Sequence, residues 1–330
     1  MADGDLRSYQ FRLEREDAWQ ELDQLLSATE KGGIRRLKSD ELVRLPHLYR
    51  GTLSALSVAR SISLDRGLVR YLEALSVRGF LAIYGNRATF LESMAIFFSV
   101  QLPQAVRQST IPLTLSALFL FLGGLTGYWV VMADPEQYFA IVPEAMAGGR
   151  HPAADVETLR ETIYSTEGFS IENLAMFASS LFGNNSMVGI FAFALGFALC
   201  VPTALLLFYN GLGIGAMIAA FEINGLGLDF WAWLSTHGTT EIFAIVLCGA
   251  GGMVIGMSII FPGRYTRMDN LAANGKRAGI IIIGAIFMLF IAGLLEGFGR
   301  QLLQDMTTRF AVGGIMLSFW VTYFVMAGRR

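Results

Sequence analysis

Long apolar runs fill the last two thirds of the chain and are separated by short polar segments. Because the hydrocarbon core of a bilayer is about 30 Å thick, a helix needs about 20 mostly apolar residues to cross it. Five runs reach this length: about 111–133, 186–208, 240–262, 278–298 and 310–327. A sixth run, about 211–234, is weaker because Glu222 and other polar residues interrupt its second half. The pattern predicts an all-α, polytopic membrane protein.

The charges of the connecting segments decide whether the sixth run crosses. The segment 134–185 is acidic, whereas 263–277 carries Arg264, Arg267, Lys276 and Arg277. Lys and Arg gather on the cytoplasmic side of membrane proteins. Only six crossings keep 263–277 and the C-terminal arginines on the same side as the N-terminal region. We therefore predict a six-helix transmembrane bundle, with both termini cytoplasmic and an extracytoplasmic loop over about 134–185.

The later part of that loop, 170–182, is rich in apolar residues. It fits two interpretations, an amphipathic helix on the outer membrane surface or an early start of the second span.

The first third of the chain mixes apolar and charged positions at helical spacing. Phe11, Trp19, Leu22, Leu25 and Leu26 recur between charges, as on one face of a helix. No apolar run stands near Met1, so we expect no cleavable signal peptide. The pattern predicts an N-terminal cytoplasmic helical bundle over residues 1–109, followed by a transmembrane domain over 110–330. A solvated helix face is the favoured interpretation of its arginines.

Composition agrees with a membrane protein and narrows the partners. Only 16% of the residues are charged and 54% are hydrophobic, whereas soluble proteins carry about 25% charged residues. The net charge of −2 gives no indication of a nucleic-acid partner. Because the runs are apolar, membrane lipid is the expected surroundings. Cys200 and Cys248 lie inside apolar runs and are expected to be small buried hydrophobes, not a disulfide.

Candidate chemistry lies in the second half of the chain. His237 and Glu241 are four residues apart and therefore share a helix face. Glu222 would join them if 211–234 and 240–262 form an antiparallel hairpin. Ionisable groups at membrane depth are expensive and usually face a bundle interior or a water-filled cavity. Such a cluster could relay protons, bind a cation or perform acid–base chemistry; a structural hydrogen-bonded pair at the outer boundary is the favoured alternative. If there is a metal, His237 and Glu241 are the only candidate ligands.

Glycines at four-residue spacing predict close helix packing. The pairs are Gly123/Gly127, Gly211/Gly215, Gly252/Gly256 and Gly293/Gly297. They are also compatible with a homo-oligomer. Asn210-Gly211 is the expected turn between the second and third spans.

Enzyme motifs are missing from the sequence. It contains no HExxH, GxSxG or Walker A pattern. The segment 225–229 has one residue too many for the GxGD of intramembrane aspartyl proteases. We expect no cofactor and favour a non-enzymatic role.

Several short motifs resemble the stage II sporulation protein M family of membrane proteins. They are Leu102-Pro103-x-x-Val106-Arg107, Asn185, Asn210-Gly211 with Gly215, His237-Gly238-x-x-Glu241, Gly249-Ala-Gly251-Gly252 before Gly256, and Pro262-Gly263. The resemblance covers about residues 15–328. It implies the broader branch with an N-terminal helical domain, found in bacteria that do not sporulate and often encoded beside AAA ATPases. The namesake in endospore formers resembles a membrane anchor that gathers cell-wall hydrolases.

Two functions follow as hypotheses. The leading one is an inner-membrane scaffold that recruits protein partners, such as envelope hydrolases or an AAA ATPase, and has a role in cell-envelope remodelling. The alternative is a small transporter, channel or lipid-handling protein built around Glu222, His237 and Glu241. A membrane hydrolase that uses His237 as base or metal ligand ranks third.

Overall fold

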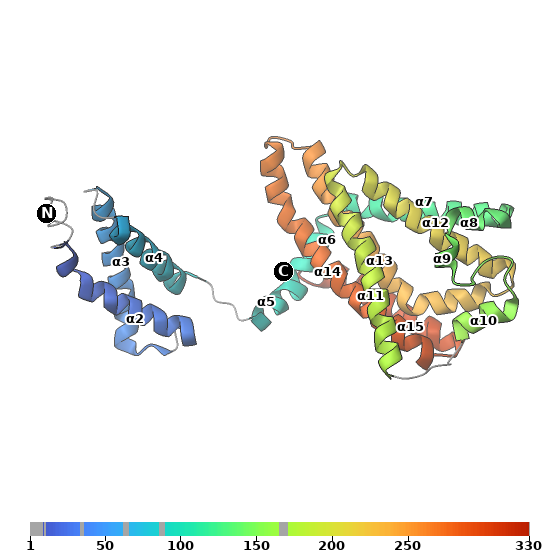
Figure 1. The fold of residues 1–330 in the computed structure, drawn as a ribbon, viewed down its shortest axis with the longest axis horizontal. Coiled ribbons are helices and arrows are strands. Elements are labelled where there is room, and N and C mark those ends of the chain that lie inside the picture. Colours follow the sequence, from blue (N-terminus) through green and yellow to red (C-terminus); the bar gives the residue numbers. More distant parts are fainter. Residues whose placement is uncertain are drawn as a thin grey trace. The chain divides into compact units, whose positions relative to one another are not determined.

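The chain is helical wherever its structure is described. The computed structural model describes residue 9 and residues 11–33, 36–61, 66–85, 90–164 and 171–329, and these ranges contain helices and turns but no strand (Figure 1). Contacts divide the chain into two compact units, Met1–Leu91 and Glu92–Arg330. The expected all-α class is confirmed.

The first unit contains three packed helices: α2 (Glu16–Gly32), α3 (Ser39–Ser61) and α4 (Arg66–Ile83). Its core consists of residues that recur at helical spacing and are buried, among them Trp19, Leu22, Leu26, Leu45, Ala59, Leu72 and Leu75. Arg78 of α4 pairs with Asp23 and Glu30 of α2. These carboxylates raise the pKa of the Arg78 guanidinium above its ordinary value. The unit therefore has an apolar core of its own, and the ion pairs of Arg78 join α2 to α4 beside it.

Residues 92–109 pack within the second unit, although the sequence analysis assigns them to the N-terminal domain. They form the end of α5 (Phe90–Ile96), a π-helical turn (Phe97–Gln101) and α6 (Leu102–Arg107). Side chains of α6 enter the core of the membrane helices. Arg107 donates hydrogen bonds to the carbonyls of Phe324 and Ala327, 2.8 and 2.7 Å away. Arg107 thus satisfies carbonyls at the end of the last helix, which have no partner within that helix.

Six helices of the second unit are long and apolar enough to cross a membrane, and this confirms the expected number. They are α7 (Thr110–Ala133), α11 (Ile171–Ala194) with the 3-10 turn η4 (Leu195–Phe197), α12 (Val201–Ile223), α13 (Gly227–Ile260), α14 (Arg267–Leu302) and α15 (Met306–Met326). α13 lies at the centre and packs against the other five.

The bounds of the second and third spans differ from the sequence prediction. The chain turns at Leu199 and Cys200, both with positive φ, inside the run 186–208 that was predicted to be one helix. The turn predicted at Asn210-Gly211 is wrong, because both residues lie within α12. There the Asn210 amide donates to the Leu206 carbonyl one turn earlier, 2.8 Å away. Of the two interpretations of 170–182, the structure shows the early start, since α11 begins at Ile171.

Glycines bring α7 and α12 into backbone contact. A Cβ at Gly215 of α12 would overlap the carbonyl oxygen of Gly124 on α7, and one at Gly123 would overlap the carbonyl of Phe208. Gly252 and Gly256 of α13 lie in the same way against the backbone of α11 and η4. The sequence prediction of close packing is confirmed for these helices.

The connection after α7 forms a folded layer at one end of the bundle. It contains η3 (Pro135–Gln137), α8 (Tyr138–Ile141), α9 (Glu144–Ala147) and α10 (Val156–Tyr164). Buried Arg309 of α15 donates to the Ile163 and Leu303 carbonyls and stacks on the Tyr164 ring. Tyr164 in turn donates to Asp229, 2.7 Å away, and burial together with this carboxylate raises the pKa of the phenol. These contacts fasten α10 to the membrane helices.

The α7–α12 contact predicts a difference between two neighbouring glycines. Gly215→Ala forces the helices apart, and overpacking of this kind costs about 1–3 kcal/mol. The melting temperature in detergent should fall by about 2–12 °C, at about 2–4 °C per kcal/mol. Gly213→Ala is the matched control, since nothing lies within 4 Å of a Cβ there. Equal melting temperatures for the two variants would contradict the packing described here.

Candidate functional site

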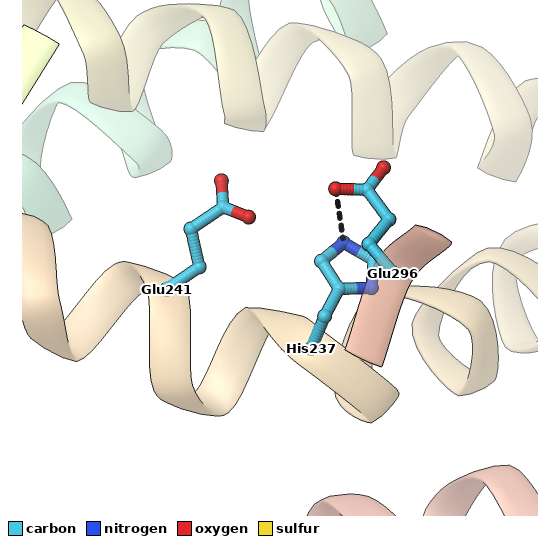
Figure 2. Close-up of side chains that lie close together, drawn as sticks. All are labelled: His237, Glu241 and Glu296. Carbon is cyan, nitrogen blue, oxygen red and sulfur yellow. Dashed lines mark ion pairs between the residues drawn. The ribbon is translucent and has the colours of Figure 1, made fainter. Parts of the chain in front are cut away.

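His237 and Glu241 lie side by side on α13, and both side chains rise from the same face of the helix (Figure 2). The spacing of four residues produces this arrangement, as the sequence analysis expected. His237 is 3% exposed, and Trp233 packs against its ring at 4.9 Å between centroids. Because α13 begins at Gly227, His237 lies about 15 Å along the helix from its start, at 1.5 Å per residue. Both residues are therefore well inside the bundle and not at its outer boundary.

A third ionisable side chain, Glu296 of α14, completes the cluster. Its Oε2 atom lies 3.8 Å from Nε2 of His237, and Glu296 is 8% exposed. One ligand atom each from His237, Glu241 and Glu296 lie within 4.8 Å of one another. We refer to these three residues as the His–Glu–Glu group. The sequence analysis missed Glu296, although it is the one charged residue of the predicted span 278–298.

Glu222 does not belong to the His–Glu–Glu group. It ends α12 as an exposed residue, with its carboxylate against Gly227 at the start of α13. The hairpin between α12 and α13 turns directly after Glu222, so this residue stays at the turn while His237 lies nearly three helical turns away. The expected neighbourhood of Glu222 with His237 and Glu241 is therefore not found.

A cavity of about 360 Å³ opens beside the His–Glu–Glu group. Its walls come from α11, α12, α13, α14 and the segment 141–150 of the folded layer. Asn185 of α11 and Asn210 of α12 line it together with His237 and Glu241. Four polar residues from three separate sequence motifs thus meet at one cavity. Arg150 is the one Lys or Arg among the described residues that line it.

One carboxylate oxygen of the His–Glu–Glu group has no partner. Glu241 Oε2 is buried and makes no hydrogen bond. An unpaired buried carboxylate is costly, because burial removes its hydration without replacing it. The arrangement therefore offers negative charge and lone pairs to a proton or a cation that enters the cavity.

The remaining motif residues lie within one helix, at helix–helix contacts or just after the end of a helix. Gly238 lies against the Leu234 side chain, and Gly252 and Gly256 allow α11 and η4 to approach α13. Pro262 follows the end of α13 at Ile260. Gly211 and Gly215 face α7. The glycines thus hold the helices that carry the polar residues.

The sequence model of the family described as Stage II sporulation protein M matches residues 116–299, more than half of the chain. The chain belongs to the stage II sporulation protein M family. The match to the stage II sporulation protein M family contains Asn185, Asn210 and the whole His–Glu–Glu group. A domain of unknown function, DUF8413, matches residues 9–85, which lie within the first unit. Neither the curated proteins nor the solved structures include a significant match.

The cavity predicts that Asn210 is reached from water. Asn210→Cys should react with a membrane-impermeant thiol reagent in intact vesicles, because the thiolate that reacts forms only where water has access. Leu205→Cys is the matched control on the same helix, since Leu205 is exposed on the apolar outer surface of α12. The parent chain, with Cys200 and Cys248, gives the background. Labelling of Asn210→Cys no greater than that background would show that the cavity is closed to water.

Proposed function

We propose that this member of the stage II sporulation protein M family is a cation transporter of the bacterial cytoplasmic membrane, with the His–Glu–Glu group as its binding site. The observation that carries this proposal is the unpartnered Glu241 oxygen beside a second buried carboxylate, at a cavity. Two neighbouring carboxylates in a low-dielectric interior do not both stay ionised unless a proton or a cation shares the site. Groups of this kind in membrane helices mark ion pathways and proton relays.

The surroundings of the group support entry of an ion from one side. Residues of the segment 141–150 line the cavity, and this segment belongs to the acidic connection between α7 and α11. The basic residues Arg264, Arg267, Lys276 and Arg277 lie at the other end of the bundle, around the turn from α13 to α14. By the distribution of Lys and Arg, we place that turn and both termini in the cytoplasm, so the cavity faces outward.

Glutamine substitutions test the transport proposal in proteoliposomes. Proton entry and Zn²⁺ entry are followed separately with enclosed fluorescent indicators. Glu296→Gln keeps the shape of the side chain and removes its charge, and interactions with a charged group contribute about 1.5–3 kcal/mol. We expect the uptake rate of the transported cation to fall about tenfold or more. Glu222→Gln, outside the His–Glu–Glu group, should leave it unchanged. No uptake above that of empty liposomes for either cation would contradict the proposal.

A second function, the scaffold, is favoured by the first unit. It has its own core and a separate family match. α4 exposes Val77, Phe80 and Leu81, and Tyr84 directly after the helix is exposed as well. Exposed apolar side chains that gather on one face mark protein interaction sites. We propose that this face binds a cytoplasmic partner such as an AAA ATPase, or a second copy of the chain, while the folded layer of residues 134–164 faces envelope hydrolases. Cation transport and partner recruitment are compatible in one protein.

The α4 face predicts a partner that depends on it. Val77→Ser with Leu81→Ser removes apolar surface without disturbing the core, since both side chains are more than half exposed. A protein that co-purifies specifically with the parent chain should be lost from this variant. The variant should reach the membrane in equal amount and melt at the same temperature as the parent. Recovery of the same proteins with parent and variant would contradict a docking role of this face.

A further inference from the structure

The His–Glu–Glu group has the donor atoms of a transition-metal site. It offers one imidazole nitrogen and two carboxylate oxygens from two neighbouring helices. Mg²⁺ and Ca²⁺ prefer sites made only of oxygen, whereas Zn²⁺ and similar ions take mixed nitrogen and oxygen ligands. The donor set therefore favours the zinc-like class over the alkaline-earth ions.

The separation of the donor atoms fits an ion between them. His237 Nε2 and Glu296 Oε2 are 3.8 Å apart, too far for a hydrogen bond, which needs about 3.2 Å or less. Zn–N and Zn–O bonds of about 2.0–2.2 Å at the tetrahedral angle place their two donor atoms about 3.4 Å apart, so an approach of about 0.4 Å lets one ion join both atoms. Glu241 Oε2 has no hydrogen-bond partner, and one ligand atom of Glu241 lies within 4.8 Å of those of the other two residues.

A neighbouring hydroxyl determines which nitrogen of the His237 imidazole carries the hydrogen. Thr236 Oγ1 lies 2.8 Å from the Trp233 carbonyl, an acceptor that takes the single hydroxyl hydrogen. The 3.2 Å contact between Thr236 Oγ1 and His237 Nδ1 must then be a hydrogen bond that Nδ1–H donates. This leaves a lone pair on Nε2, directed at the Glu296 carboxylate. Metal-binding histidines usually have their second nitrogen held by a neighbour in this way.

The formal charge of the three side chains matches a divalent ion. Counted by themselves and with a neutral imidazole, they carry a formal charge of −2, which equals the charge of one divalent cation. A balanced charge matters here because net charge within a membrane bundle is expensive.

From these four features we infer that the group binds one zinc-class divalent ion through His237 Nε2 and one oxygen each of Glu241 and Glu296. The inference deepens the cation-binding site proposed above and rests on it. Three protein ligands leave a fourth position of a tetrahedral ion open, and this position faces the cavity. A water molecule or a donor group of a solute in the cavity fills it, so the ion is exchangeable and not locked in the fold.

The test uses the full chain in lipid nanodiscs, stripped with chelator and equilibrated with Zn²⁺ alone. We expect one bound zinc per chain by elemental analysis, and a rise in melting temperature on zinc addition. Co²⁺ in its place should give the strong visible absorption of a tetrahedral site. Glu241→Gln and Glu296→Gln should bind at least tenfold more weakly and lose the temperature rise, whereas Glu222→Gln should behave as the parent.

Thr236 supplies a second, independent readout. Thr236→Val removes the acceptor of Nδ1–H, and loss of such a partner weakens metal binding about 10–100-fold. Thr236→Ser keeps the hydroxyl and should restore the affinity. Less than half an equivalent of zinc on the parent, or equal zinc on parent and both glutamine variants, would overturn the inference. Bound zinc without cation uptake would refute transport and leave the metal site standing, whereas proton uptake without bound zinc would do the reverse.

Discussion

The central place of α13 is the constraint on which the rest of the membrane domain depends. In the most apolar 18-residue stretch of α13, 78% of the residues are buried, a larger share than in any other candidate span. The reason is that the other five spans all pack against it. A helix in this position can carry ionisable residues away from lipid. His237 and Glu241 therefore occupy a protein interior whose dielectric and hydration the neighbouring helices determine.

Two kinds of contact shape that interior. Backbone contact through glycines joins α12 to α7 and joins η4 to α13, while α11 packs mainly against α13 and α14. Because α12 packs against α7 and α11 packs against α14, a space stays open between α11 and α12. The cavity beside the His–Glu–Glu group lies here, so the close glycine contacts and the polar residues of this chain belong to one architecture.

The sequence was sufficient for the number of spans but not for their bounds. Apolar length determines how many helices can cross, and six was correct. The turn was placed at Asn210-Gly211 because Asn and Gly favour turns. A glycine that packs against a neighbouring helix has the same appearance in one sequence as a glycine that turns. The true turn, at Leu199 and Cys200, contains no turn-forming residue at all.

The candidate site was predicted in part for a related reason. Helical spacing brought His237 and Glu241 together, because that relation is local. Glu296 lies on another helix, and only the packing of α14 against α13 brings it near. The prediction includes Glu222 because the apolar runs 211–234 and 240–262 place the turn of the hairpin between them. In the structure the turn lies earlier, between Ile223 and Gly227. Local geometry could thus be read from the chain, whereas contacts between helices needed the fold.

The measurement that tests the central claim most directly is anomalous diffraction, at the zinc absorption edge, from crystals of the full chain grown in lipid with Zn²⁺. The account predicts a single anomalous peak within the membrane domain, about 2.0–2.2 Å from His237 Nε2 and from an oxygen of each glutamate. No peak there, with the imidazole and the carboxylates joined by direct hydrogen bonds, would show that the group is a structural element of the bundle and not a cation site.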